Sequence, residues 1–321
     1  MNTSSQTVLI LGARGRLGRA VTEAFARSGW RVKAQTRRGG GGWPAGVEEV
    51  LCDALDSNMT MAAAQGVQVV VNALNPLYTA WETEALPLAE QGIAVASAAG
   101  AVLLYPGNVY NFGPELPEML DETTSFADDG ANTAKGRIRV AIERRLQEAA
   151  QQGLVSATIR AGDFFGGAGR GSWFDLAIVK DLAKGKVVYP GPLNRVHAWA
   201  YLPDLAETFV GVAEARERLS GASRLHFPGY GVTGEELLLG IEGVVGRRVR
   251  RGGMPWGLMR LATPFAPMLR AIFEMRYLWQ RPHQLEGRRL DGLLAEVPHT
   301  PLREALRGAL QALDLLPERG R

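Results

Sequence analysis

The sequence predicts an α/β fold with a doubly wound parallel sheet and a smaller α/β region toward the C-terminal end. Short apolar segments alternate with helical segments through the first half of the 321 residues, which is the rhythm of βαβ units. The apolar segments are almost continuous, as is typical of strands buried on both faces of a sheet. A glycine-rich turn directly follows the first of these segments.

Each strand of the sheet is predicted from one short apolar run that is bounded by turn-forming or polar residues. The six runs lie at 7–13, 31–36, 47–52, 67–73, 101–106 and 156–161. Helices are predicted between them at 17–27, 81–98 and 133–151. Six strands in this arrangement complete a dinucleotide-binding sheet, so residues 1–166 are predicted to form a nucleotide-binding domain.

The remaining residues, 167–321, are predicted to form a smaller substrate-binding region, with 195–215 returning to the first domain. A glycine-rich link at 166–171 separates the two parts. Capping residues and proline positions predict where the helices of the second part begin. These helices are expected at 172–183, after Pro203 with Asp204 as the N-cap, after Thr233 with Glu236 completing a capping box, across the proline-interrupted stretch 255–279, and at 301–316.

Composition excludes several classes of protein. Cys52 is the only cysteine and the four histidines are scattered, so neither a disulfide framework nor a metal site is expected. Thirty-six basic and 33 acidic residues leave a net charge of +3, which is too even to predict a nucleic-acid partner. The apolar run at 8–11 is too short for a signal peptide or a membrane span. We therefore expect a cytoplasmic location.

The turn GARGRLG at 12–18 follows a predicted strand and opens a predicted helix, which is the context of a phosphate-binding turn. Gly12 permits the tight turn, Gly15 lets the backbone approach a pyrophosphate, and Gly18 lets the helix pack on the sheet. The helix N-terminus then favours the anion. A Rossmann dinucleotide site is thus predicted at Gly12, Ala13, Arg14, Gly15, Arg16, Leu17 and Gly18.

The GxxGxxG spacing resembles the short-chain dehydrogenase/reductase superfamily, in its extended and atypical branches. The resemblance is to NAD(P)-dependent epimerase/dehydratases, with features of NmrA-like and isoflavone-reductase-like proteins. Segments at 52–56, 72–76, 105–113 and 135–143 follow in the order of that superfamily. The resemblance implies that the cofactor is also contacted by Asp53, Ala54, Asn72, Ala73, Leu74, Pro106 and Lys135.

The end of the second predicted strand bears on the choice between NAD(H) and NADP(H). An acidic residue there would bind the ribose 2′-hydroxyl, whereas arginine pairs with a 2′-phosphate. Arg37 and Arg38 occupy this position, and Arg14 lies inside the phosphate turn. NADP(H) is therefore favoured over NAD(H), since the guanidinium fork suits bidentate phosphate contacts. The alternative is that Arg37 and Arg38 are merely solvated.

Reductases of this superfamily use a Tyr-x-x-x-Lys motif, and the resemblance places Lys135 at the lysine and Ala131 at the tyrosine. The serine position near Pro106 is also lost. In a first interpretation, Lys135 is the general acid/base, as in the isoflavone-reductase-like branch, because a lysine desolvated beside a cationic nicotinamide exchanges its proton near neutrality. Tyr110 or Asn108 would then polarise the substrate carbonyl.

Two other interpretations stay open. The chain is an NADP(H) sensor without chemistry, as NmrA-like regulators are, or Lys135 only binds the cofactor ribose. In the latter case proton transfer falls to Asp163, His197 or Tyr201. We expect an oxidoreductase that transfers hydride to or from a small carbonyl or hydroxyl substrate. A nucleotide-sugar epimerase or dehydratase is a further alternative, against which the missing tyrosine counts.

The stretch 247–289 contains ten arginines and only two acids, Glu274 and Glu286. An anionic ligand would suit such a stretch, but arginines interleaved with apolar residues favour a solvated face. A membrane-surface helix is the alternative for 254–279, where prolines favour broken helices that pack over a pocket. We expect a small-molecule substrate and neither a nucleic-acid nor a membrane partner. Homodimers are common among such proteins, and the sequence leaves the oligomeric state open.

Overall fold

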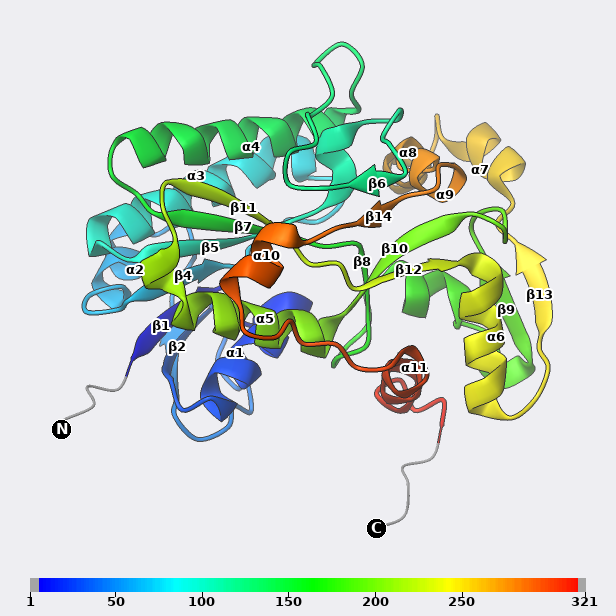
Figure 1. The fold of residues 1–321 in the computed structure, drawn as a ribbon, viewed down its shortest axis with the longest axis horizontal. Coiled ribbons are helices and arrows are strands. Elements are labelled where there is room, and N and C mark those ends of the chain that lie inside the picture. Colours follow the sequence, from blue (N-terminus) through cyan, green and yellow to red (C-terminus); the bar gives the residue numbers. More distant parts are fainter. Residues whose placement is uncertain (1–5, 317–321) are drawn as a thin grey trace.

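The computed structural model describes residues 6–316. Its centre is a seven-stranded sheet of order β11-β7-β5-β4-β1-β2-β3, in which every neighbouring pair is parallel (Figure 1). The order reverses between β1 and β4, so the crevice at the carboxyl ends of these strands is the topological switch point. The strands are β1 (Thr7–Leu11), β2 (Arg31–Thr36), β3 (Val47–Leu51), β4 (Val69–Asn72), β5 (Val102–Gly107), β7 (Ser156–Arg160) and β11 (Ala222–His226).

Helices cover both faces of this sheet (Figure 1). Successive side chains of a strand point to opposite faces, so an apolar strand needs a covering layer on each side. In β1, Val8 and Ile10 face the core that contains α1 and α5, whereas Leu9 and Leu11 face the core of α3 and α4. All four are fully buried, which explains why the strand is apolar at every position. The helices are α1 (Arg16–Arg27), α2 (Ser57–Ala63), α3 (Trp81–Ala99), α4 (Ala134–Gln151) and α5 (Leu202–Glu214).

A second core lies beside the large sheet and joins aromatic residues to two helices (Figure 1). Phe165, Phe174 and Trp199 pack there with Leu237 of α6 and Leu306 of α11. Three small sheets frame it: β8 (Asp163–Phe165) with β10 (Val196–Tyr201) and β12 (Tyr230–Thr233), β9 (Lys186–Tyr189) with β13 (Arg250–Gly253), and β6 (Met119–Leu120) with β14 (Gln284–Leu285). Around it lie α6 (Gly234–Val245), α7 (Trp256–Ala262), α8 (Pro267–Glu274), α9 (Tyr277–Gln280) and α11 (Leu302–Gln311), whereas α10 (Arg288–Leu293) packs in the core of the large sheet.

The predicted parallel α/β sheet is confirmed, and the six predicted strands form within two residues of their predicted ends. The capping box of Thr233 and Glu236 is also confirmed. A seventh strand, β11, pairs with β7 after α5 crosses back, so the chain's return to the large sheet extends beyond 215. The sequence does not predict α2, a helix of seven residues with the carboxylate of Asp56 as its N-cap.

The prediction that Asp204 caps a helix is wrong. Tyr201 is the N-cap of α5, and Pro203 lies in its first turn, where a missing N–H costs nothing. The Asp204 carboxylate instead accepts hydrogen bonds of 2.7 Å from both the backbone N–H and the hydroxyl of Thr300. The predicted helix at 172–183 is broken in two, because a π-helix at Phe174–Ile178 and a 3-10 helix at Leu182–Lys184 form in place of one continuous helix.

A buried arginine fixes the sheet edge on which the functional residues lie. Arg160, at the end of β7, is 1% exposed and forms an ion pair with Glu143 of α4. It also donates to the side-chain oxygen of Asn111, at 2.9 Å, and to the backbone oxygen of Asn108. Glu143 forms a second ion pair, with Arg224 of β11, at 3.2 Å. The strand, the helix and the segment after β5 are thereby joined through one charged cluster.

Glu143→Ala is predicted to lower the free energy of unfolding by about 3–5 kcal/mol, because it leaves the buried Arg160 cation without a counter-charge. Urea unfolding followed by circular dichroism measures the change. The control is Glu90→Ala, which removes an ion pair of Arg145 in which both side chains are about half exposed and which is worth at most about 1 kcal/mol. Equal losses in the two variants would contradict a structural role for the Arg160 cluster.

Candidate functional site

The predicted phosphate turn lies at the switch point of the sheet. Gly12 has a φ of +77°, a left-handed conformation that favours glycine. Its N–H donates a 2.9 Å hydrogen bond to the side-chain oxygen of Gln35, which is buried at the end of β2. A Cβ at Gly12 would lie 3.1 Å from the backbone of Ala73 and of Leu74. The turn is therefore held between the ends of β2 and β4.

The start of α1 fits an anion. A Cβ at Gly18 would lie 2.2 Å from the carbonyl oxygen of Gly12, so only glycine lets the helix approach the turn this closely. The N-cap residue, Gly15, contributes no side-chain cap, and the first turn of α1 carries no acidic residue. The first N–H groups of the helix and its positive dipole end are thus left for an external group such as a pyrophosphate.

The two arginines of the turn have different roles. Arg14 donates 3.0 and 2.9 Å hydrogen bonds to the backbone oxygens of Arg38 and Gly39, which joins the turn to the β2–β3 loop. Arg16 forms a 2.8 Å ion pair with Asp175 and donates to the backbone oxygen of Gly166, so it ties α1 to the second region. Ala13 and Leu17 are buried in the core and offer only backbone atoms.

Among the cofactor-contact residues carried over from the superfamily, one carboxylate is exposed and two other side chains are buried. Asp53 is exposed, and its carboxylate accepts from the N–H of Leu55, whereas Ala54 is buried. Asn72 is fully buried, donates to the backbone oxygen of Leu88 at 2.9 Å and accepts from the N–H of Leu74 at 3.2 Å. Its amide therefore anchors α3 and shapes the turn at 73–74.

Lys135 lies in the first turn of α4, two residues after the N-cap residue Thr133. Its side chain is buried, and its ammonium nitrogen is 2.7 Å from a carboxylate oxygen of Glu274, the last residue of α8. The same nitrogen lies 4.6 Å from the centre of the Tyr78 ring. Lys135 is thus held between the segment that follows β4 and a helix from the C-terminal region, while Ala131 is exposed.

Tyr110 lies in the 3-10 turn Val109–Phe112 that follows β5. Asn108 is the N-cap of this turn, and its side-chain oxygen accepts from the N–H of Tyr110 at 3.1 Å, so Asn108 positions the tyrosine. Burial, with a smaller effect of the Asp163 charge, raises the pKa of Tyr110 to about 12. The phenol is therefore neutral at physiological pH and can donate a hydrogen bond. The backbone oxygen of Pro106 accepts from Arg139 at 3.1 Å.

Asp163 and His197 form a pair next to the cluster of Lys135, Glu274, Tyr78 and Tyr110. The Asp163 carboxylate is 2.8 Å from Nε2 of His197, and Nδ1 of His197 is 3.2 Å from the backbone oxygen of Leu278. The imidazole stacks on Trp279 at a ring separation of 4.1 Å. Tyr201 does not join them, since its ring packs on Phe165 and its hydroxyl lies beside Gly308 of α11.

The sequence did not single out two residues of the cluster, Tyr78 and Glu274. Tyr78 follows β4 at the same sheet edge as the phosphate turn, and burial raises its pKa well above the ordinary value. Glu274 is 139 positions from Lys135 along the chain. One signal was available for it: Glu274 is one of only two acids in the arginine-rich stretch 247–289.

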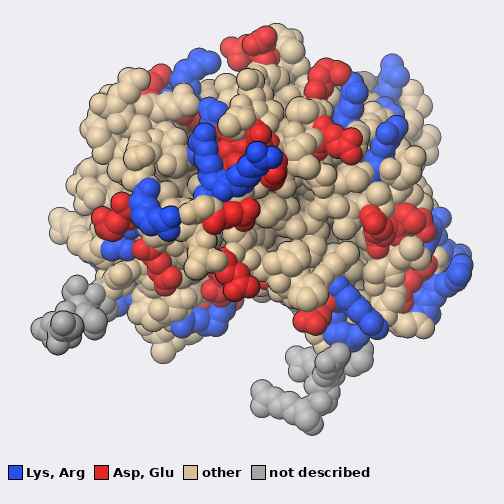
Figure 2. Space-filling model, in the orientation of Figure 1, with Lys and Arg blue, Asp and Glu red and all other residues tan. Residues whose placement is uncertain are grey.

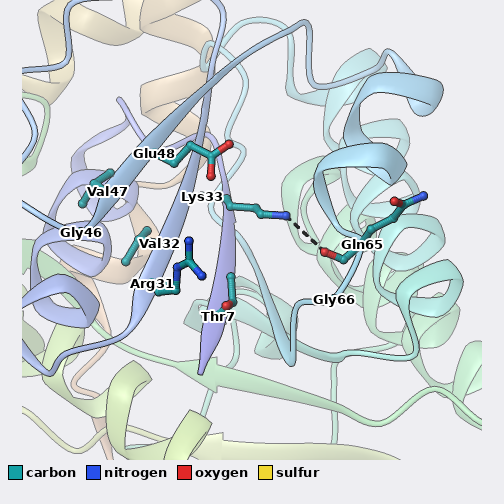
Figure 3. A pocket seen from close by; sticks show the side chains of 9 residues that line it. All are labelled: Thr7, Arg31, Val32, Lys33, Gly46, Val47, Glu48, Gln65 and Gly66. Atoms are coloured by element: carbon teal, nitrogen blue, oxygen red, sulfur yellow. Dashed lines mark hydrogen bonds between the residues drawn. The ribbon is translucent and has the colours of Figure 1, made fainter. Parts of the chain in front are cut away.

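A polar hollow of about 510 Å³ lies elsewhere, at the amino ends of β1, β2 and β3 (Figure 3). Lys33 spans it and donates to the backbone oxygens of Ala63 and Gln65 at 2.8 and 3.2 Å. Ligands of doubly wound sheets bind outside the opposite, carboxyl ends of the strands. The hollow is therefore separate from the candidate site.

A model of the NAD-dependent epimerase/dehydratase family matches residues 8–223. The chain belongs to this family. The match covers the phosphate turn, Lys135, and the Asp163–His197 pair, and it confirms the resemblance inferred from the sequence. Glu274 lies outside the matched range. No curated protein matches the chain at a significant level.

Solved structures with the same fold include three proteins that bind or act on nucleotide sugars according to their names. MoeE5 in complex with UDP-glucose and NAD is 18% identical, with a TM-score of 0.75, and the match covers 97% of this chain and 99% of that chain. UDP-glucose 4-epimerase from Bifidobacterium longum in complex with NAD+ and UDP is 14% identical, with a TM-score of 0.76 and coverages of 96% and 98%. UDP-N-acetylglucosamine 4-epimerase from Bacillus cereus is 14% identical, with a TM-score of 0.74 and coverages of 98% and 100%. At such identities the likeness concerns the fold.

Three further observations concern the surface, the helices and the residue types that bind metals. Lys and Arg side chains are interspersed with Asp and Glu across the face shown in Figure 2. Within residues 6–316, no helix is both long enough and apolar enough to cross a bilayer. Over the same residues, no three His, Cys, Asp or Glu side chains gather in a way that suits a metal ion.

Gly18→Ala is predicted to weaken dinucleotide binding at least tenfold, because the new methyl group would force the Gly12 carbonyl and α1 apart. The free energy of unfolding should also fall by roughly 1–3 kcal/mol, the usual cost of overpacking. Isothermal titration with NADPH and NADH, together with urea unfolding, measures both effects.

The matched control is Gly243→Ala in α6, where a Cβ meets no atom within 4 Å. This variant should bind as the unmodified chain does and gain up to about 1 kcal/mol of stability from the better helix former. Unchanged binding in Gly18→Ala would show that close packing at the turn is not required.

Proposed function

We propose that this protein is an NADP(H)-dependent oxidoreductase of the epimerase/dehydratase family, acting on a small substrate with a carbonyl or hydroxyl group. One observation carries the proposal. Lys135, Tyr78, Tyr110 and Asp163 gather beyond the carboxyl ends of β4, β5 and β7, at the same edge as the phosphate turn. Proton-transfer groups and a dinucleotide cradle at one sheet edge are what hydride chemistry requires.

The dinucleotide would be held by the backbone at 12–18, by the turn at 73–74 and by Lys135, and it supplies the hydride donor or acceptor. Tyr110 presents a neutral hydroxyl that can donate a hydrogen bond to the substrate oxygen and pass it a proton. Lys135 adds a positive charge that favours negative charge developing on that oxygen. The C-terminal helix α8 covers Lys135 and limits access of water to it.

The position of Tyr110 offsets the loss at Ala131. A tyrosine four residues before Lys135 would lie in the turn before α4, whereas Tyr78 and Tyr110 lie in the segments after β4 and β5. Asp163 and His197 are the second candidate for the proton donor. Nδ1 of His197 faces the backbone oxygen of Leu278 and Nε2 faces the Asp163 carboxylate, so this pair is placed to share a proton at the site.

Tyr110→Phe is predicted to lower turnover by about 10²- to 10⁴-fold, the range for loss of a general acid, with NADPH affinity unchanged. Lys135→Met should lower turnover and weaken NADPH binding together. Activity is measured as NADPH oxidation with a panel of aldehydes and ketones. Tyr201→Phe, a tyrosine outside the cluster, is the matched control and should keep full activity.

If Tyr110→Phe retains turnover and His197→Asn abolishes it, the proton donor is the Asp163–His197 pair. A chain that binds NADPH and NADP+ unequally but turns over no compound of the panel would overturn the enzyme proposal and favour the NmrA-like sensor. A nucleotide-sugar substrate is the alternative that the three similar folds support. In that case UDP-glucose, added with NAD+, should raise the melting temperature more than glucose does.

The preference for NADP(H) has its own test. Arg37 and Arg38 are exposed at the end of β2, and the carboxylate of Glu49 in the neighbouring β3 accepts from Trp43, Gly40 and Thr36. Combined Arg37→Ala and Arg38→Ala substitution should weaken NADPH binding by at least about tenfold, since a hydrogen bond to a charged group contributes roughly 1.5–3 kcal/mol. NADH affinity should not change.

Arg31→Ala is the control for this test, because Arg31 is an exposed arginine at the opposite end of the same strand. It should leave both affinities unchanged. Tighter binding of NADH than of NADPH to the unmodified chain would contradict the cofactor preference while leaving the proposed hydride transfer intact.

A further inference from the structure

The helices α7 and α8 carry an apolar surface that no part of the described chain covers. Leu258, Leu261, Phe265 and Met268 are 71%, 74%, 89% and 45% exposed. These four large apolar side chains lie within eleven consecutive residues of α7, α8 and the link between them, and Figure 1 shows the two helices at the upper right edge of the molecule. A concentration of exposed apolar side chains of this kind marks an interaction site more often than chance exposure.

The opposite side of this helical pair is fixed to the protein. The indole N–H of Trp256 donates a 2.6 Å hydrogen bond to the backbone oxygen of Pro190, and its ring packs on Trp173. At the other end, Glu274 forms the ion pair with Lys135. Because both ends are anchored, the four apolar side chains are held outward by the fold.

Up to Glu274, the charged side chains of this segment itself are all arginines. Residues 247–273 contain six arginines and neither aspartate nor glutamate. Arg260 on α7 and Arg270 on α8 are exposed, and within residues 6–316 neither forms an ion pair. An apolar surface edged by unpaired arginines complements a partner that is apolar inside and anionic at its face.

A second copy of the chain does not meet this requirement. In a two-fold dimer the same surface meets itself, so the arginines of one copy would face those of the other. A bilayer containing anionic lipids does meet it, because apolar side chains enter the boundary of the acyl chains while arginines remain among the phosphates. We propose that α7 and α8 dock the protein onto an anionic membrane surface.

This inference is independent of the proposed oxidoreductase function, and it replaces the expectation that the chain has no membrane partner. The sequence predicts that the stretch 254–279 packs over a pocket. In the structure the stretch packs on the protein through Trp256 and Glu274. It also presents Leu258, Leu261 and Phe265 to the outside. Docking at this surface would place the membrane beside the helix that covers Lys135.

Co-sedimentation with lipid vesicles tests the proposal. The full chain should bind vesicles of phosphatidylglycerol and phosphatidylcholine at least tenfold more tightly than vesicles of phosphatidylcholine alone, and added salt should weaken binding. Combined Leu258→Ser, Leu261→Ser and Phe265→Ser substitution should lower binding at least tenfold. Arg260→Gln with Arg270→Gln should reduce the preference for phosphatidylglycerol.

The matched control is Leu77→Ser, which removes a leucine that is 77% exposed after β4. It should bind vesicles as the unmodified chain does. All variants are first compared with the unmodified chain by circular dichroism and by urea unfolding, which show that they are folded. Unchanged vesicle binding in the folded triple variant would overturn the proposal, and so would a dimer in light scattering that the triple substitution dissociates.

Discussion

The close approach of α1 to the turn at Gly12 constrains the rest of the site. Because no Cβ fits between Gly18 and the Gly12 carbonyl, the helix begins directly at the carboxyl ends of β1 and β4. Its uncapped first turn then points its N–H groups into the crevice. Gln35 fixes the turn from the other side by accepting the Gly12 N–H. Every residue assigned a chemical role lies along the same sheet edge.

The residues proposed to act on the substrate, and the acid that pairs with Lys135, come from segments far apart in the sequence; together they form the reaction end of this sheet edge. Tyr78 and Tyr110 come from the segments after β4 and β5, Lys135 from α4, and Glu274 from the C-terminal helices. Ala131 supplies no phenol, and the aromatic hydroxyls of this end come instead from the segments after β4 and β5. Glu274 also links the reaction end to the exposed apolar surface of α7 and α8, because α8 ends at this residue.

Local patterns predicted the large sheet well. Continuous apolar runs predict buried parallel strands, and side chains such as Val8 and Leu9 pack on opposite faces as that pattern requires. Long-range pairs were not predictable in this way. Nothing near Lys135 in the sequence indicates Glu274, and nothing near Arg160 indicates that Glu143 neutralises it. Asp204 has the sequence context of a cap, but Thr300, 96 positions away, binds its carboxylate instead.

Hydrogen exchange of the backbone amides, followed by mass spectrometry with and without NADPH, tests the central claim most directly. Binding at the switch point predicts slower exchange in peptides that cover 12–18 and 72–75, and no change in peptides that cover the amino ends of β2 and β3. Protection confined to other segments, or no protection at a saturating concentration, would contradict the assignment of the turn as a dinucleotide site.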